Sequence, residues 1–206
     1  MRLVDGLNRL GLTYSKNQLV CLQTILHEHL KWNKIYNISA HRDEKNVLIY
    51  QILDSLTPYD FIREGRLLDV GTGPGFPGLP LALFFPNTHV MVVDSNNKKL
   101  AFSRHIKALC NIGNLQIVHK RIEELPTTHQ FDQIISRAFT HLNGMIECSL
   151  AFLKPGGEIL AMKGAQAESE IVTAQSTHGN CMIRLHKLPH IVDEQRMLVV
   201  VKQRSE

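Results

Sequence analysis

A glycine-rich segment that follows a short apolar run is the strongest chemical signal in the sequence. Asp69-Val70-Gly71-Thr72-Gly73-Pro74-Gly75 closes the apolar run Arg66–Val70. Glycines here allow a sharp turn and let a ligand approach the backbone closely. A second apolar run, His89–Asp94, ends in an acid that can accept hydrogen bonds from two ribose hydroxyls. Together the two features predict a nucleoside cofactor at the carboxyl ends of two strands.

Two classes of cofactor fit this segment. Gly73–Gly78 satisfies the GxGxxG pattern, so a nicotinamide-dependent oxidoreductase is one interpretation. Pro74 and Pro77, however, remove two backbone N–H donors that a pyrophosphate would use. S-adenosylmethionine has no phosphate, and Asp69 beside the loop suits the positive charge of its sulfonium. The sequence therefore favours S-adenosylmethionine, and a glycine turn without a ligand is the third interpretation.

The elements that must position these residues alternate between strands and helices. Strands are expected at 66–70, 89–94, 115–118, 131–136 and 158–162, with two more near 181–188 and 197–202. Helices are expected at 98–110 and 144–153, and 79–85 is a further apolar segment. This order predicts βαβ units and a mostly parallel sheet of seven strands, with an antiparallel hairpin formed by the last two.

The first part of the chain has helical periodicity and no strand pattern. Apolar residues recur at helical spacing from Leu19 to Leu30, behind a candidate N-cap at Ser15, and again from Asp43 to Leu53 before Pro58. We expect an N-terminal helical cap over residues 1–62 and an S-adenosylmethionine-binding domain over 63–206, packed as one globular unit.

Composition and charge set broad limits. The chain has 206 residues, 44% of them hydrophobic, and a formal net charge of +4, which permits a polyanionic partner without requiring one. Its four cysteines form no CxxC pair, no secretory leader is recognisable, and no apolar stretch approaches the roughly 20 residues of a membrane span. We expect a cytoplasmic protein, monomeric and without membrane contact.

The whole chain resembles the ribosomal RNA small subunit methyltransferase G family, also called glucose-inhibited division protein B. The resemblance rests on five segments: Lys31–Asn37, Ile52–Ser55, Asp69–Gly78, Ser136–Phe139 and Ala161–Gly164. It implies a Rossmann-like class I methyltransferase fold behind the helical cap. It also implies methylation of N7 of one guanine in the 16S rRNA of the small ribosomal subunit, with S-adenosyl-L-methionine as cofactor.

The resemblance further implies the roles of particular residues. Gly71 and Phe76 are expected to contact the cofactor, and Ile122 and Glu123 are expected to contact its adenine through their backbones. Arg137 is expected in the site as well, in a cofactor-binding or a catalytic role, and Arg196 in the last hairpin as a second catalytic residue. Together with Asp94, these are the predicted site residues.

One position departs from the family pattern. Gln51 stands where relatives often have histidine, and glutamine can form hydrogen bonds but cannot carry a proton near neutral pH. We expect that no proton transfer is needed at this position. A ribosome-assembly factor that keeps the fold and the cofactor but lacks the activity is the alternative.

The implied reaction needs little chemical machinery. Guanine N7 has a lone pair and no hydrogen, so no general base must remove a proton before attack on the methyl group. The Asp/Asn-Pro-Pro-Tyr motif of many amine-methylating enzymes is replaced here by Ser136–Phe139. Phe139 is either a stacking partner for the base or a core aromatic. Arg137 contacts guanine O6, a phosphate or the cofactor carboxylate, or pairs with a carboxylate of the sheet.

Basic and aromatic residues add weaker signals. Cations expected on the cofactor-side rim, where they could contact RNA phosphates, are Lys31, Lys34, Arg42, Lys98, Lys99, Arg104, Lys163 and Arg196. Trp32 and Tyr36 lie one helical turn apart and are expected to attach the cap to the sheet domain. The histidines show no ligand spacing, so we expect no metal.

Overall fold

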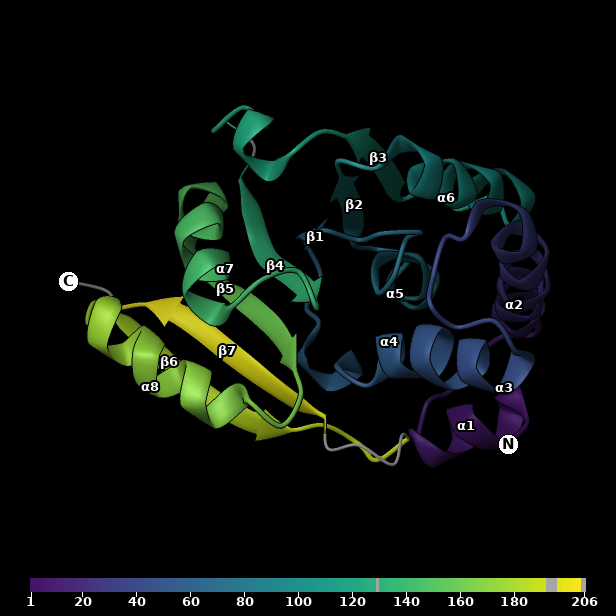
Figure 1. The fold of residues 1–206 in the computed structure, drawn as a ribbon, viewed down its shortest axis with the longest axis horizontal. Coiled ribbons are helices and arrows are strands. Elements are labelled where there is room, and N and C mark those ends of the chain that lie inside the picture. The colour runs from purple at the N-terminus through teal and green to yellow at the C-terminus, as the bar shows by residue number, and fades with distance from the viewer. Residues whose placement is uncertain (129, 192–195, 205–206) are drawn as a thin grey trace.

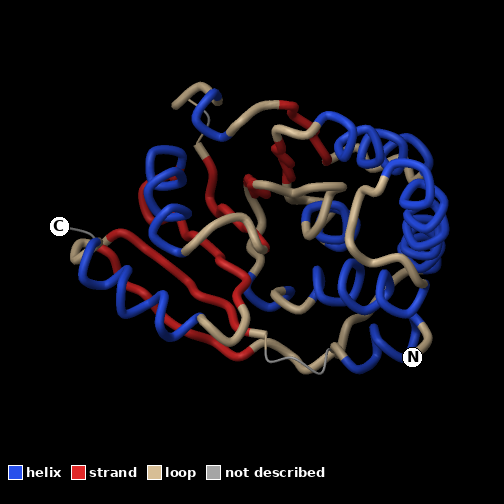
Figure 2. The backbone as a smooth tube through the Cα atoms, in the orientation of Figure 1, coloured by secondary structure: helices blue, strands red, loops and turns tan. Residues whose placement is uncertain are grey.

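The sheet at the centre of the molecule carries the elements that form the site. The structure, a computed structural model, describes residues 1–128, 130–191 and 196–204. Its strands are β1 (Arg66–Val70), β2 (His89–Asp94), β3 (Leu115–His119), β4 (Phe131–Arg137), β5 (Leu153–Lys163), β6 (Cys181–Lys187) and β7 (Met197–Gln203). They form one seven-stranded sheet in the order β3-β2-β1-β4-β5-β7-β6 (Figures 1 and 2). β1 to β5 are parallel, and β7 is antiparallel to both β5 and β6.

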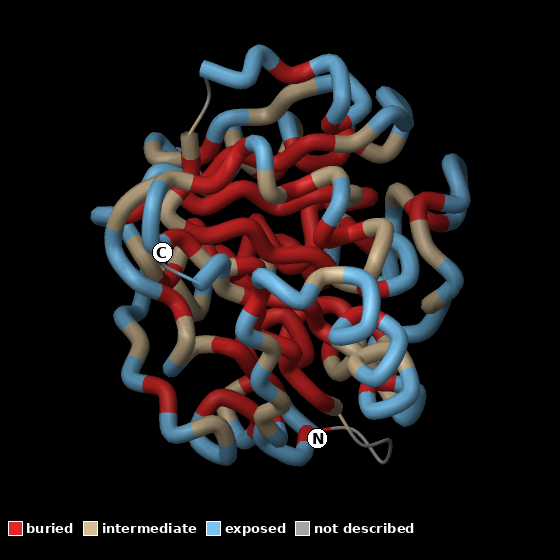
Figure 3. Tube along the Cα trace, turned by 90° about the vertical axis from the view of Figure 1, so that its left-hand side faces the viewer, coloured by how far each residue is buried: buried red, intermediate tan, exposed pale blue. Residues whose placement is uncertain are grey.

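Helices cover both faces of this sheet. The α-helices are α1 (Leu3–Arg9), α2 (Lys16–Tyr36), α3 (Glu44–Asn46), α4 (Asp54–Leu56), α5 (Gly78–Phe84), α6 (Asn97–Leu109), α7 (Leu142–Ser149) and α8 (Ala167–Thr177). A π-helix, η1 (Val47–Leu53), joins α3 to α4, and short 3-10 turns are η2 (Tyr59–Phe61), η3 (Ile122–Glu124) and η4 (Leu150–Phe152). Figure 3 shows the buried segments gathered at the centre of the molecule, with exposed segments around them.

Two hydrophobic cores lie on opposite faces of the sheet. The larger joins the cap helices, α5 and α6 to β1 and β2, for example through Leu22, Ile52 and Phe102, all of which are fully buried. The smaller joins α7 and α8 to the other face through residues such as Ile146 and Ala174. Because the same core contains cap residues and sheet residues, the cap is fixed against the sheet by buried apolar area.

The cap begins as the sequence predicts. Ser15 is the N-cap of α2, with its hydroxyl accepting from the Gln18 backbone N–H and the Gln18 side chain accepting from the Ser15 N–H. Trp32 packs edge-on against Phe102, 5.8 Å between ring centroids, and lies 5.2 Å from the ring of His105. Trp32 therefore attaches α2 to α6, as predicted, whereas Tyr36 is 54% exposed.

The sequence and the structure differ in three elements. The segment predicted as an ordinary helix over 43–53 contains the π-helix η1, whose wider turns leave backbone groups for other partners. β5 begins at Leu153, five residues before its predicted start, because Leu153 pairs with Phe131 ahead of a register shift. The helix α8 was not predicted, since it buries only the small residues Ala167 and Ala174 and carries no broad apolar stripe.

Two further findings concern membrane-spanning helices and the cysteines. In the part of the chain that the structure describes, no helix is long and apolar enough to cross a membrane. The four cysteines are free, two of them buried and two partly buried.

Candidate functional site

Two cavities adjoin at the carboxyl ends of the parallel strands, where open α/β sheets bind their ligands. The larger, about 760 Å³, lies between the cap and the ends of β1, β4 and β5. The smaller, about 240 Å³, lies at the ends of β2 and β3. Both are lined by Gly71, Ala138 and Phe139, so these residues separate one cavity from the other.

The backbone N–H groups of the glycine loop already have acceptors within the protein. Gly71 and Thr72 donate to the Val93 carbonyl, and Gly75 and Phe76 donate to the Thr72 carbonyl. The Gly73 N–H donates to the Asp94 carboxylate at 2.8 Å, and Pro74 has no N–H. A pyrophosphate needs free donors of this kind. The loop offers none, so its geometry argues against a dinucleotide more strongly than its prolines did.

Asp69 lies beneath the loop and does not line either cavity. Its Oδ2 accepts from the Thr72 hydroxyl at 2.5 Å and from the Gly78 N–H at 2.7 Å, and the residue is fully buried. Burial raises the pKa of this carboxyl to about 6. The expectation that Asp69 faces a cofactor's charge is therefore wrong, and its role is to shape the loop.

Asp94 lines the smaller cavity, as expected for an acid that meets a ribose. One carboxylate oxygen accepts from Gly73 and the other accepts from the Asn96 N–H at 2.7 Å. A carboxylate has about four acceptor sites, so capacity remains for hydroxyl donors. Ile122 and Glu123 line the same cavity, and Gly71 and Phe76 line the larger one.

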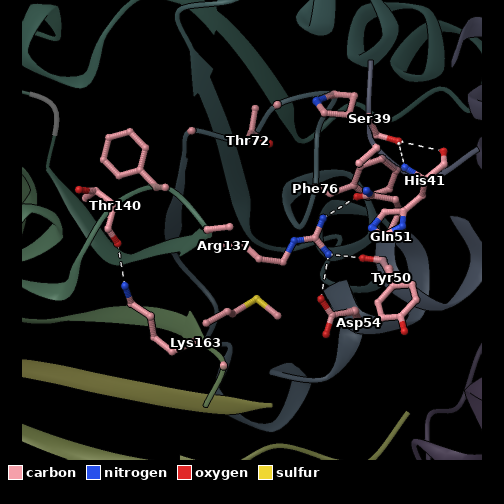
Figure 4. Close-up of a pocket in the computed structure, with 18 of the residues that line it drawn as sticks. Ser39, His41, Tyr50, Gln51, Asp54, Thr72, Phe76, Arg137, Thr140 and Lys163 are labelled. Atoms are coloured by element: carbon pink, nitrogen blue, oxygen red, sulfur yellow. Dashed lines mark hydrogen bonds and ion pairs between the residues drawn. The ribbon is translucent and has the colours of Figure 1, made fainter. Parts of the chain in front are cut away.

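Arg137 extends from the end of β4 into the larger cavity and is held by one turn of the cap (Figure 4). Its Nη1 donates to the Tyr50 carbonyl at 2.5 Å and to Asp54 Oδ2 at 2.9 Å, and its Nη2 donates to Gln51 Oε1 at 2.5 Å. All three acceptors come from η1 and the start of α4. The guanidinium is thereby fixed in one orientation by a backbone, an amide and a carboxylate oxygen.

Asp54 joins the two predicted arginines. Its side chain is 1% exposed, and its second oxygen accepts from Arg196 Nε at 3.1 Å. Sequence reasoning did not assign a role to Asp54, although a carboxylate within the apolar run Ile52–Leu56 was a usable signal, because a buried acid needs a partner. Arg137 does pair with a carboxylate, but the carboxylate belongs to the cap and not to the sheet.

Gln51 has a clear structural role. It is buried and supplies the amide oxygen that accepts from Arg137. A neutral acceptor suits this place, since a cation here would repel the guanidinium. Close by, the pKa of His41 lies below its usual value because burial and the charge of Arg137 both disfavour the imidazolium.

Phe139 is 39% exposed and its ring lies over Gly71. A Cβ at position 71, where φ is +66°, would come within 2.5 Å of the Phe139 ring, so both the conformation and the close approach require glycine. Of the two predicted roles for Phe139, the core aromatic is therefore wrong.

The predicted basic rim divides into four groups, of which one, Lys34, Arg42 and Lys98, is exposed and lines neither cavity. Lys99, Lys163 and Arg196 line the larger cavity. Lys31 is exposed and forms an ion pair with the partly buried Glu28 at 2.6 Å. Arg104, in the middle of α6, lines a cleft at the opposite edge of the sheet, while its guanidinium donates to Asn97 at the start of α6.

The structure also brings in residues that were not predicted. Glu170 of α8 accepts from Lys163 Nζ at 2.7 Å and from the Leu142 N–H at the start of α7 at 2.6 Å. Lys163 also donates to the Thr140 carbonyl, so this contact set holds the loop that carries Phe139. Within the described residues, no group of three or more His, Cys, Asp or Glu side chains could hold a metal ion.

The fold is that of the class I methyltransferases. A putative O-methyltransferase from Klebsiella pneumoniae superposes with a TM-score of 0.63 at 13% identity, covering 88% of this chain and 90% of that one. At this level of identity the likeness concerns the fold alone.

Sequence comparison gives the family. The family model GidB, rRNA small subunit methyltransferase G, matches residues 17–199. A ribosomal RNA small subunit methyltransferase G from Cellvibrio japonicus is 39% identical, covering 83% of this chain and 80% of its own. One from Escherichia coli (strain SMS-3-5 / SECEC) is 36% identical, covering 92% and 89%. The chain belongs to the rRNA small subunit methyltransferase G family, and the resemblance noted from its motifs is confirmed.

Proposed function

We propose that this protein transfers a methyl group from S-adenosylmethionine to N7 of a guanine in the 16S rRNA of the small ribosomal subunit. The observation that carries the proposal is the pair of adjoining cavities at the carboxyl edge. One has a carboxylate for a ribose and the other has two arginines. Family membership over residues 17–199 supports the rRNA substrate.

The residues present fit S-adenosylmethionine. The cofactor is a nucleoside joined to an amino acid, and it carries no phosphate that would need the loop's N–H groups. We assign the adenosine end to the smaller cavity, with Asp94 toward the ribose and the backbones of Ile122 and Glu123 toward the adenine. The amino-acid end lies toward Gly71 and Phe76, with Arg137 available to its carboxylate. When bound, the cofactor supplies a methyl group on a positively charged sulfur.

The protein's part in the reaction is alignment. Guanine N7 needs no deprotonation, so the pocket needs no general base, and the depressed pKa of His41 suits a neutral, non-catalytic imidazole. Bringing two reactants into line can lower a barrier by roughly 7–11 kcal/mol. Arg137 and Arg196 are the groups that we assign to this task, by contact with guanine O6 or a flanking phosphate.

Phe139 is the residue that we assign to stacking on the guanine. Its ring is partly exposed and lies at the boundary of the two cavities, between the proposed cofactor and substrate positions. Enzymes that act on a nucleobase take it out of the stack and hold it against aromatic side chains. We also propose that residues 1–62 act as a cap that closes the substrate side, because Gln51 and Asp54 hold Arg137 from there.

Two experiments test this function. Small subunits from a strain lacking the gene are incubated with the protein and labelled S-adenosylmethionine, and 16S rRNA is then cleaved by borohydride and aniline at N7-methylguanine. We expect one new cleavage site that depends on the protein. A mark that is present without the gene would contradict the proposal. Calorimetry with S-adenosylmethionine and with NAD separates a methyltransferase from an oxidoreductase. We expect S-adenosylmethionine to bind and NAD not to bind.

A further inference from the structure

A second cleft lies at the opposite edge of the sheet from the candidate site. Its volume is about 520 Å³, and its lining includes Arg66, His89 and Leu115, the first residues of β1, β2 and β3. The cofactor cavities lie at the other ends of these strands. We call this feature the amino-edge cleft. None of the residues assigned to catalysis or cofactor binding lines it.

Four basic residues line this cleft and no acidic residue does. They are Arg66, His89, Arg104 and Lys107, and none of them forms an ion pair with any residue that the structure describes. The unpaired charges of Arg66 and Lys107 line one concave surface and repel one another, and an anion would relieve this repulsion.

Neutral groups hold these cations in place. The Arg66 guanidinium lies over the Phe131 ring, 5.1 Å from its centroid. Lys107 Nζ donates to the Leu115 carbonyl at 2.5 Å, and Arg104 Nη1 donates to Asn97 Oδ1 at 2.9 Å. A lysine ammonium has three donors and an arginine has five. The side chains of Arg66, Arg104 and Lys107 are thus oriented by contacts with neutral groups, which leave most of their donors unused.

An open strip connects this cleft to the cofactor cavities. β3 is the edge strand of the sheet, and only the 3-10 turn η3 stands between β3 and β4, where a helix would otherwise cover the face (Figure 1). Gln116 at one end of β3 is exposed, and Lys120 and Arg121 beyond its other end line the smaller cavity. The five residues of β3 span about 16 Å, which several phosphates of a nucleic acid strand would cover.

We propose that the amino-edge cleft and the β3 edge bind the phosphate backbone of the RNA substrate at a distance from the methylated base. This inference rests on the proposed rRNA substrate. The partner is an RNA phosphodiester chain, because the charged groups are spread along a strip longer than one small anion. Contacts of this kind position the protein without reading sequence.

The test is binding of the full-length protein to small ribosomal subunits at several salt concentrations. Replacing both Arg104 and Lys107 by glutamine (R104Q/K107Q) removes two phosphate contacts, so the slope of log affinity against log salt should become shallower by about 2. Affinity at low salt should fall roughly tenfold or more. Calorimetry with S-adenosylmethionine should give the wild-type affinity. R104Q alone should change the slope by about 1. Because Arg104 is exposed, this single variant still tests the proposal if the double variant misfolds.

The control is R9Q/K16Q, which removes one arginine and one lysine that are exposed and line neither this cleft nor the candidate site. Equal salt slopes for R104Q/K107Q and R9Q/K16Q would overturn the proposal. A second result would also overturn it. If inorganic phosphate bound to the wild type in calorimetry, and R104Q/K107Q abolished this binding without changing the affinity for the subunit, the cleft would be a site for a small anion. Because the readout is binding, failure of methyl transfer in the wild type would contradict the proposed function without deciding this inference.

Discussion

The proposed cofactor half of the candidate site and its proposed substrate half are assembled in different ways. The cofactor half uses the glycine loop and Asp94, where backbone hydrogen bonds join the ends of two adjacent strands. The substrate half joins the cap, β4 and β7, with Asp54 buried between Arg137 and Arg196. The first half depends on local backbone geometry and the second on charge balance between distant segments.

The cap contacts the two halves by different means. His29 packs edge-on against Phe76 of the glycine loop, at 5.9 Å between centroids, and neither of its ring nitrogens has a hydrogen-bond partner. Asp54 and Gln51 reach the substrate half with polar contacts. We therefore expect mutations in the cap to affect the halves separately, and four predictions follow from largest effect to smallest.

The largest effect is expected for Asp54→Ala. It leaves two partly buried guanidinium groups without their shared carboxylate, and breaking a buried pair in this way costs about 3–5 kcal/mol of stability. Misplacement of the arginines should also lower kcat/KM by roughly a hundredfold. Urea unfolding and methyl transfer measure the two effects. Asp60→Ala, at an exposed acid of η2, should change neither, and a normal kcat/KM in Asp54→Ala would refute the dependence on charge balance.

The next effect is a change in the pH dependence of stability. Burial lowers the pKa of His29 from 6.5 to about 4, so the folded state takes up its proton later than the unfolded state as the pH falls. Stability due to this residue is complete above pH 6.5 and is lost as the pH falls toward 4, by about 3 kcal/mol.

His29→Phe should remove this loss, so the variant should gain about 3 kcal/mol over the wild type at pH 4 relative to pH 7. The variant is compared with the wild type at each pH because Asp69 contributes a pH dependence of stability with the opposite sign. The pKa of Asp69 is raised to about 6, so its contribution to stability is lost as the pH rises through 6. Urea unfolding at both pH values measures the effect. His27→Phe, at an exposed histidine of the same helix, is the control, and identical behaviour of the two variants would exclude His29 as the source.

A smaller effect is expected for Asp94→Ala in the cofactor half. Loss of hydrogen bonds from ribose hydroxyls to a charged acceptor should weaken S-adenosylmethionine binding roughly 10- to 100-fold. RNA affinity should change little, whereas Arg196→Ala should weaken mainly RNA use. Calorimetry and subunit binding separate the two. Asp43→Ala removes a carboxylate that also accepts a backbone N–H but lies outside the cavities, and cofactor binding equal to that of Asp94→Ala would count against the ribose role.

The smallest effect is expected for Phe139→Ala. Loss of stacking on one base costs about 1–3 kcal/mol, so KM for the small subunit should rise roughly tenfold while S-adenosylmethionine binding is retained. Phe139→Trp keeps a stacking surface and should restore most of the loss. Steady-state kinetics measure both. If Phe139→Ala instead lowered stability without changing KM, the ring would be a structural cover for the glycine loop.

The sequence predicted the elements around the glycine loop better than the contacts between the cap and the two arginines, for a physical reason. Strand β1, the glycine loop and Asp94 follow from apolar runs and turn residues that lie within a short stretch of chain. The pairing of Asp54 with Arg196 spans 142 positions, and no local pattern encodes it. Motif resemblance placed Arg137 and Arg196 in the site, yet only the structure joins them through a common acid.

Other features were outside the reach of periodicity. The helix α8 has small buried residues and no strong stripe, so its Glu170 and the contact to Lys163 could not be anticipated. Arg104 lies in the middle of α6, so its position in the sequence did not show that it lines a cleft at the amino edge while its guanidinium reaches Asn97.

The π-helix η1 also limits how the cap can change in length. Surface loops tolerate inserted or deleted residues, but Tyr50, Gln51 and Asp54 meet one guanidinium from a helix that is widened between Val47 and Leu53. Deleting one residue within this segment would return the widened turn to ordinary α-helical geometry and change which oxygens face the guanidinium. The arginine that the cap holds therefore constrains the length of this segment as well as its residue types.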